Sequence, residues 1–452
     1  MVSIYAVALL GVISSGPASV AEAAPAPGFK IQPGLIFNNP KGKKAKQLTI
    51  ITQINKGIDN APRGSNIYMA QYLFDIDSVA NKLIAAHRRG VNVKVLIDDG
   101  TPTKQSRRVK AALGTNKKAR SYVTTCKRSC MANVASVMHA KFYLFSQTGA
   151  SKLVSMVSSA NPYTGNTFTS WNNNHTIVGD RAIYNSLVKY FNDMILDRNN
   201  TRYYRTTQSG KYKLYLFPRA PQPGVQTVIP IDVLNHVACT GVAKGYGSKG
   251  KTVIRIAMWG WTGGRRDLAN QLWAMHNRGC KVEVIINSGR TNSGVMKQLL
   301  KKSKKYGRMK VYDAWQDFNK NGLPGLYIHH KTFMINGRWF GHPNTKVTYT
   351  GSQNFSAPAT TVNNDIVMRI IDNGTYNAYG KNLDYIRKKY TRKLNSVPKV
   401  YTRSLSVKAM DAKIDALEEG RITEKEFAKS IGTSKVKSKG KTELEDKLVI
   451  GD

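Results

Sequence analysis

The chain has 452 residues and carries 69 Lys and Arg against 27 Asp and Glu, a formal net charge of +42. Its hydrophobic content of 41% predicts a packed core, which excludes a wholly disordered chain, and its length suits two domains or one two-lobed domain. The charge indicates a polyanionic partner, and it does not distinguish nucleic acid from an anionic phospholipid surface. Adaptation to an acidic or crowded environment is a further explanation of the charge.

The N-terminus has the pattern of an export signal. An apolar run occupies 4–13, and Ala21-Glu22-Ala23 matches an A-x-A cleavage site. We therefore expect residues 1–23 to be a signal peptide and the mature protein to be secreted. The signal departs from the usual pattern, because no Lys or Arg precedes the apolar run. That run is too short to span a bilayer, and no later apolar stretch is long enough to do so.

Four cysteines suit an oxidising compartment. Cys126 and Cys130 are close enough in sequence to bridge a loop, and Cys239 can then pair with Cys280, although all three pairings remain open. A zinc site formed by Cys126, Cys130 and His139 is the alternative. The sequence disfavours it, because no second closely spaced cysteine pair completes a tetrahedral set of ligands.

An internal repeat organises the chain. The segment 80–90, ANKLIAAHRRG, recurs at 269–279 as ANQLWAMHNRG, with seven of eleven positions identical. Each copy has the pattern of an amphipathic helix that ends at a glycine and lies between two short strands. A strand, a helix and a second strand predict a βαβ unit, and hence parallel strands covered by helices. The expected strands are 66–73, 91–97, 252–259 and 281–286.

The similarity continues with two H-x-K motifs, His139-Ala-Lys141 and His329-His-Lys331, each opening an apolar strand. An S-x-N element follows each motif, Ser159-Ala-Asn161 in the first half and Ser352-Gln-Asn354 in the second. Residues i and i+2 of a strand share a face, so each motif sets an imidazole beside an ammonium group. A single H-x-K motif often arises by chance, but two copies tied to S-x-N elements in a duplicated fold indicate a site.

These side chains suit the cleavage of phosphodiesters, which hydrolyse very slowly without a catalyst. Histidine titrates near working pH and can act as a nucleophile or a general acid, and lysine supplies a positive charge for the phosphate oxygens. The predicted catalytic residues are His139, Lys141, His329 and Lys331. The predicted phosphate-binding donors are Ser159, Asn161, Ser352 and Asn354.

The paired motifs resemble the signatures of the phospholipase D superfamily, and the resemblance covers about residues 40–400. It implies an α/β fold, an α-β-α sandwich of two similar lobes with one active site at their interface. It also implies a mechanism without metal or other cofactor, in which one histidine attacks phosphorus and the other protonates the leaving group. The expected divisions are a first repeat at 40–200, a connector at 201–226, a second repeat at 227–400 and a basic, partly disordered tail at 401–452.

The chain departs from the family pattern at the acid that usually lies seven residues after each histidine. Ser146 and Asn336 occupy these two positions. Members that resemble tyrosyl-DNA phosphodiesterase also lack this acid, so its loss is compatible with activity.

A second acidic position, after the S-x-N element, usually orients a histidine in this family. Asp365 fits it in the second half and is expected to orient His329, whereas Thr176 stands at the matched position in the first half and leaves His139 without a carboxylate. The resemblance makes His139 the nucleophile and His329 the general acid. The expected Asp365 contact would instead make His329 the more basic imidazole.

Three functions remain open. Basic runs at 41–46 and 301–305, with interspersed Tyr and Trp, favour a secreted phosphodiesterase that acts on nucleic acid. A phospholipase D that releases phosphatidic acid is the alternative. Segments around 259–261, 315, 323–327 and 339 would supply its apolar rim unless they pack in the core. The loss of both acids also allows a noncatalytic polyanion-binding descendant. No obligatory protein partner is indicated.

Overall fold

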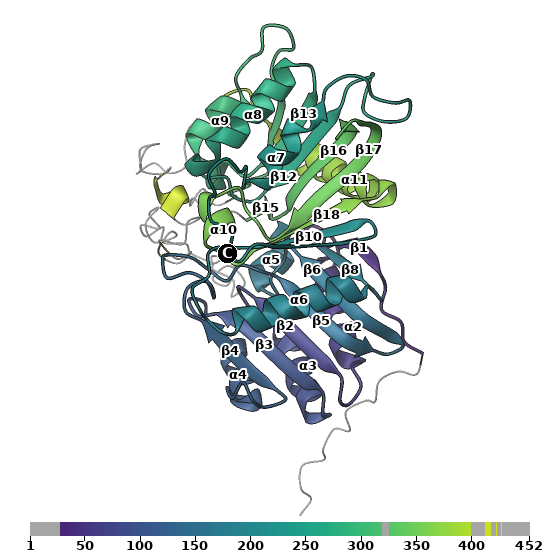
Figure 1. Ribbon diagram of the computed structural model, residues 1–452, viewed down its shortest axis with the longest axis vertical. Coiled ribbons are helices and arrows are strands. Elements are labelled where there is room, and N and C mark those ends of the chain that lie inside the picture. The colour runs from purple at the N-terminus through teal and green to yellow at the C-terminus, as the bar shows by residue number, and fades with distance from the viewer. Residues whose placement is uncertain (1–27, 319–324, 399–411, 417–421, 423–425, 427–452) are drawn as a thin grey trace, which may run out of the picture.

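The computed structural model describes residues 28–318, 325–398, 412–416, 422 and 426, and these form two α/β lobes stacked along the long axis of the molecule (Figure 1). The two-lobed fold predicted from the duplication is confirmed. The predicted signal peptide at 1–23 and most of the predicted tail at 401–452 lie outside the described residues. Among the described residues, no helix combines the length and the apolar character needed to cross a bilayer.

The first lobe is a seven-stranded mixed sheet with helices on both faces. Apolar side chains of α2 (Thr49–Asp59), α3 (Asp77–Arg88) and α4 (Lys104–Leu113) pack against one face of the sheet. The helix α6 (Arg181–Met194) packs against the other face. The strands in spatial order are β1 (Gly34–Phe37), β8 (Asn173–Ile177), β6 (Ser151–Ser158), β5 (Phe142–Thr148), β2 (Asn66–Gln71), β3 (Asn92–Asp98) and β4 (Tyr122–Cys126).

The second lobe repeats this plan in a longer sheet. Helices α7 (Ile229–Asn235), α8 (Arg266–Asn277) and α9 (Ser293–Leu299) cover one face, and α11 (Asn373–Tyr390) covers the other. The strands in spatial order are β19 (Arg392–Lys393), β14 (Lys310–Asp313), β13 (Lys281–Ile286), β12 (Val253–Met258), β16 (Lys331–Trp339), β17 (His342–Gly351), β18 (Ile366–Ile371), β10 (Tyr212–Leu216) and β9 (Arg205–Ser209).

Both predicted βαβ units are present. The strands β2 and β3 are parallel and joined by α3, and β12 and β13 are parallel and joined by α8. Gly90 and Gly279 end the two turns that follow these helices with φ of 84° and 99°, a left-handed conformation that glycine adopts without a Cβ penalty. Phe142, which follows the first H-x-K motif, pairs with Ala70 near the end of β2, and Lys331 pairs with Met258 at the end of β12. Both motifs therefore lie at the carboxyl edges of parallel strands.

The segment predicted as a connector at 201–226 is more structured than its sequence pattern indicates. It contains a hairpin, β9 and β10, which turns at Gly210 and extends the second sheet through antiparallel pairing of β10 with β18. In this position β10 corresponds to β1 of the first sheet, which pairs with β8. The hairpin thus completes the second lobe, and only the proline-containing stretch after it connects to α7.

Short elements join the two lobes. The strand β7 (Ser170–Trp171) of the first lobe pairs in parallel with β15 (Tyr327–Ile328) of the second. A parallel bridge between Met138 and Asn364 makes a second junction. Each junction ends beside one of the H-x-K histidines. The remaining short elements are α1 (Lys44–Gln47), α5 (Thr164–Phe168), β11 (Val237–Ala238), the 3-10 turns η1 (Gly263–Arg265) and η2 (Ser288–Arg290), and α10 (Ala357–Thr361).

Candidate active site

His139 is held by the second lobe. It directly follows the Met138–Asn364 bridge, and its backbone N–H donates to the carbonyl oxygen of Asn364 at 3.0 Å. Its imidazole Nδ1 lies 2.9 Å from Oδ1 of Asp365, and both side chains are buried. A ring nitrogen that donates to a carboxylate leaves the lone pair on the other nitrogen, so Nε2 is the nitrogen of His139 suited to attack.

His329 is held by the first lobe in the same way. It follows β15, and its backbone N–H donates to the carbonyl oxygen of Trp171 in β7 at 2.9 Å. Its Nδ1 lies 2.7 Å from Oδ1 of Asn172, the residue after β7. The amide group of Asn172 donates to the carbonyl oxygen of Asn166 at 2.9 Å, which turns the amide oxygen towards His329. Each histidine therefore takes its partner from the opposite lobe.

The position of Asp365 corrects one prediction. The sequence predicts that Asp365 orients His329, but the structure places it on His139 and gives His329 an amide partner instead. Thr176 is not the counterpart of Asp365. That counterpart is Asn172, which lies as far after Ser159 as Asp365 lies after Ser352, and this equal spacing was the signal in the sequence that would have found it.

The two serines of the S-x-N elements contact these partner residues. Ser352 Oγ donates to Oδ1 of Asp365 at 2.5 Å, and Ser159 Oγ donates to Oδ1 of Asn172 at 3.1 Å. Both serines are buried. Their hydroxyl groups thus position the groups that orient the histidines.

Both asparagines of these elements are buried. Asn161 is buried, accepts the backbone N–H of Leu73 at 3.2 Å and donates to Asn166 at 3.2 Å. Asn354 lies two residues after Ser352 and precedes Phe355, whose backbone N–H donates to the carbonyl oxygen of Gly260. The structure therefore brings both asparagines to the edges that carry the histidines.

The two lysines differ. Lys331 Nζ lies 2.8 Å from Nε2 and 3.3 Å from Nδ1 of His329, so its ammonium group rests against the imidazole. Lys141 is fully buried, donates to the backbone oxygen of its own histidine, His139, at 2.9 Å, and lies 5.4 Å from the ring centre of Tyr72. The imidazole–ammonium contact predicted for both motifs is therefore direct in the second motif only.

Charged groups from both lobes act on the pKa of His139. Burial lowers the pKa of His139, and the nearby charges of Lys141 and of Lys331 from the other lobe lower it further. The charge and the hydrogen bond of Asp365 act in the opposite direction. The net result is a lowered pKa, which keeps the imidazole of His139 neutral at neutral pH.

The two residues that stand in place of the usual acid accept hydrogen bonds from the backbone. Ser146 Oγ accepts the backbone N–H of Asn66 at 2.8 Å, and Asn336 Oδ1 accepts that of Gly247 at 2.9 Å. Both lie several residues along their strands from the H-x-K motifs. These hydrogen bonds hold neighbouring backbone segments at the ends of the sheets that lie away from the H-x-K motifs.

An aromatic group borders His329. The ring of Trp259 lies 5.3 Å and that of Tyr327 lies 6.3 Å from the imidazole, and the guanidinium of Arg290 lies 5.0 Å from the Trp259 ring. These side chains are buried, as are Trp261, Trp315 and Trp339. These four tryptophans therefore pack in the interior and are not part of an exposed apolar rim, while residues 323 and 324 of the expected rim lie outside the described residues.

The cysteines form two disulfides, Cys126–Cys130 and Cys239–Cys280. This pairing removes Cys126 and Cys130 as metal ligands and overturns the alternative of a zinc site with His139. Within the described part of the chain, no group of three or more His, Cys, Asp or Glu side chains is arranged to hold a metal ion.

Comparison with known proteins identifies relatives. The family model described as "Cardiolipin synthase, PLD-like domain" matches twice, over residues 54–195 and 248–387. No curated protein sequence matches the chain.

Two solved structures share the fold. Phosphatidylserine synthase from Haemophilus influenzae Rd KW20 aligns with a TM-score of 0.55 at 13% identity, over 84% of this chain and 91% of that chain. Polyphosphate kinase from Porphyromonas gingivalis aligns with a TM-score of 0.51 at 14% identity, over 85% of this chain and 53% of that chain, so this chain spans about half the length of that kinase. At these identities the likeness establishes the fold alone.

Proposed function

The chain belongs to the phospholipase D superfamily, whose family model matches both lobes, and from this premise we propose that it is a phosphodiesterase. The proposed enzyme works without metal and forms a phosphohistidine on His139. The observation that carries this proposal is the exchange of partners between lobes. His139 contacts Asp365 of the second lobe, and His329 contacts Asn172 of the first. A protein that kept the duplicated fold only for binding would not need each histidine to contact a partner in the other lobe.

The difference between the Asp365 carboxylate and the Asn172 amide assigns the roles of the two histidines. A carboxylate stabilises a cationic imidazole more than a neutral amide does, because the carboxylate carries a full charge. Asp365 therefore supports the positive charge that His139 acquires when Nε2 bonds to phosphorus. His329 contacts the neutral amide oxygen of Asn172 and lies against the Lys331 ammonium, whose charge favours release of the proton that His329 donates. The electrostatic argument and the family resemblance now agree on His139 as the nucleophile.

In the first step Nε2 of His139 attacks phosphorus, the bond from phosphorus to the leaving oxygen breaks, and His329 donates a proton to that oxygen. Lys331 and Lys141 offset the charge of the nonbridging oxygens. In the second step the now neutral His329 takes a proton from water, the water oxygen bonds to phosphorus, and the bond to Nε2 breaks. Both histidines return to their starting protonation states.

A trapping experiment tests this assignment. A diester with a nitrophenolate leaving group needs no proton from the enzyme, so a His329→Ala variant should form the phosphoenzyme and hydrolyse it very slowly. Mass spectrometry under alkaline conditions should then place the phosphoryl group on His139, and a His139→Ala variant should carry none. A phosphoryl group found on His329 in the His139→Ala variant would reverse the roles. No covalent adduct on either histidine would refute the mechanism.

Nucleic acid is the proposed substrate. A net charge of +42 favours a polymer with many phosphates, and the four tryptophans expected in a lipid-binding rim are buried. Purified protein should cleave plasmid DNA or RNA in the presence of EDTA. Turnover that disappears with the chelator would contradict a metal-free mechanism, and the absence of turnover on DNA, RNA and phospholipid would favour the noncatalytic polyanion-binding protein.

A phospholipid is the second candidate. It is supported by the description of the matching family model, a cardiolipin synthase domain, and by the shared fold with a phosphatidylserine synthase. Vesicles of phosphatidylcholine with and without an anionic lipid provide the test. Release of a head group, or its transfer to an added alcohol, at a rate above that of DNA cleavage would make lipid the substrate.

We also propose that the protein is secreted. Two disulfides support an oxidising compartment, because thiols in the cytosol are kept reduced. Expression of the full chain with its N-terminus intact should place the activity in the culture medium, and activity retained in the cytosol would argue against export.

A further inference from the structure

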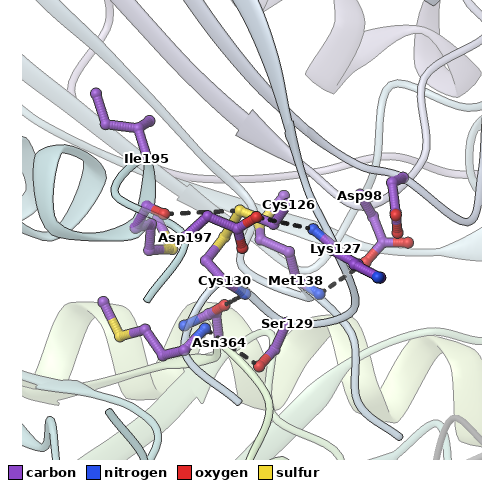
Figure 2. The surroundings of a disulfide bond; sticks show 12 residues. Asp98, Cys126, Lys127, Ser129, Cys130, Met138, Ile195, Asp197 and Asn364 are labelled. Carbon is purple, nitrogen blue, oxygen red and sulfur yellow. Dashed lines mark hydrogen bonds between the residues drawn. A yellow bond between two sulfur atoms is a disulfide. The ribbon is translucent and has the colours of Figure 1, made fainter. Parts of the chain in front are cut away.

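The Cys126–Cys130 disulfide lies at the edge of the first sheet, next to the junction that carries His139. Cys126 ends β4, the last strand of that sheet, and both cysteines are buried. Figure 2 shows the disulfide between Asp197 and Met138, with Asn364 of the second lobe beside Cys130. His139 comes nine residues after Cys130, so the disulfide determines where this segment leaves the sheet.

The segment from Ser129 to His139 is hydrogen-bonded to the second lobe at both of its ends, through Ser129 and Cys130 and through Val137 and His139. The contacts come from one short stretch of that lobe, 362–364, which immediately precedes Asp365. They are Cys130 N–H to Asn364 Oδ1 at 2.7 Å, Ser129 Oγ to the Val362 oxygen at 2.7 Å, Val137 N–H to Asn363 Oδ1 at 3.0 Å, Asn364 N–H to the Val137 oxygen at 3.2 Å and His139 N–H to the Asn364 oxygen at 3.0 Å.

Asn364 is the centre of this set of contacts. Its side chain binds Cys130, its N–H and carbonyl groups bind Val137 and His139, and its own neighbour is Asp365. The disulfide fixes one end of the segment, and the His139–Asp365 contact lies at the other. A displacement of about 1 Å in such a segment is enough to lower a reaction rate about 100-fold, because it spoils the alignment of the reacting groups.

We propose that the Cys126–Cys130 disulfide and Asn364 form a positioning device that holds His139 against Asp365 across the lobe boundary. This inference rests on the proposed function for its kinetic consequence, but the geometry can be tested without substrate. The disulfide locks the turn at 126–130, the turn presents Cys130 N–H to Asn364, and Asn364 sets the register of both His139 and Asp365.

The second disulfide offers a matched control. Cys280 directly precedes β13, at the end of the sheet where Lys281 pairs with Val253. The site lies at the other end, where Met258 of β12 pairs with Lys331. Five residues of strand separate these ends, about 17 Å. Loss of Cys239–Cys280 therefore removes one disulfide without touching the junction that holds His139.

The direct test is the coupling between Asp365 and His139. The pKa of His139, measured by NMR titration of ring-labelled histidine, should fall when Asp365 is replaced by Asn in the wild-type background. In the Cys126→Ser/Cys130→Ser background the same replacement should change the pKa of His139 much less, and in the Cys239→Ser/Cys280→Ser background it should have its full effect. An Asp365→Asn effect of equal size in all three backgrounds would overturn the proposal.

Kinetics provide the second readout. With a substrate that the wild type turns over, kcat of the Cys126→Ser/Cys130→Ser variant should fall on the order of 100-fold with little change in KM, and the Cys239→Ser/Cys280→Ser variant should keep kcat. An unchanged kcat in a folded Cys126→Ser/Cys130→Ser variant would contradict the positioning role. If that variant does not fold, Asn364→Ala, which removes the side-chain acceptor for the Cys130 N–H, takes its place under the same criteria. A wild type without turnover would refute the proposed function, while the NMR result would still decide this inference.

Discussion

Nδ1 of His139 and Oδ1 of Asp365 lie 2.9 Å apart although the two residues belong to different lobes and are 226 positions apart in sequence. The pair gives the first-lobe imidazole a buried carboxylate, whereas the second-lobe imidazole has a buried amide. The two halves of the duplication thus share a plan but differ in charge at the matched position. This difference distinguishes the nucleophile from the acid in the proposed mechanism.

Replacing Asp365 with Asn should lower kcat by about 10²- to 10⁴-fold, the range in which removal of a histidine-orienting carboxylate acts in other enzymes. Because Asp365 raises the pKa of His139, its loss lowers that pKa. The acid limb of kcat/KM, which reports the deprotonation of the nucleophile, should move to lower pH while the maximum falls. A limb that moves to higher pH would mean that His139 is not the group that titrates there.

Replacing Asn172 with Asp should affect the alkaline limb of the pH dependence of kcat/KM. A carboxylate beside His329 stabilises its protonated form, so the alkaline limb of kcat/KM should move to higher pH. The change also sets a carboxylate oxygen against the carbonyl oxygen of Asn166, which now accepts the amide of Asn172. Urea unfolding should show a loss of about 1–3 kcal/mol from this lost hydrogen bond. A shift in the acid limb instead would assign the histidines the other way round.

The sequence was sufficient for the parts of the site that lie within one lobe. The repeated sequence predicted the two H-x-K motifs, their strands and the βαβ units, because local periodicity determines these elements. The pairing of His139 with Asp365 could not be predicted in this way, since it depends on how two sheets pack through β7, β15 and the Asn364 bridge. The hairpin β9–β10 was missed for the same reason: the partner of β10 is β18, about 150 residues later.

Binding of nucleic acid should depend strongly on salt. The inactive His139→Ala variant provides the measurement, because it binds without cleaving. If about six phosphates are contacted, the affinity for single-stranded DNA should fall about 300-fold between 50 and 200 mM salt, since each neutralised phosphate releases a counterion. Phosphatidylcholine vesicles, which carry no net charge, serve as the control. Binding to DNA that is insensitive to salt would argue against a nucleic-acid substrate.

Asp98 should make the stability of the first lobe depend on pH. Its carboxylate accepts the backbone N–H groups of Met138 at 2.8 Å and Gly100 at 3.0 Å, and burial raises its pKa to about 7. As pH rises from about 4 to 7 the unfolded chain ionises at this residue while the folded chain stays protonated, so stability is lost over that window at about 1.4 kcal/mol per pKa unit. Asp98→Asn cannot ionise, and its free energy of unfolding relative to the wild type should therefore rise between pH 4.5 and 7.5 in urea titrations. Asp77→Asn, which changes an exposed carboxylate on α3, should show no such rise. A difference between Asp98→Asn and the wild type that stays constant with pH would mean that Asp98 is ionised in the folded protein throughout.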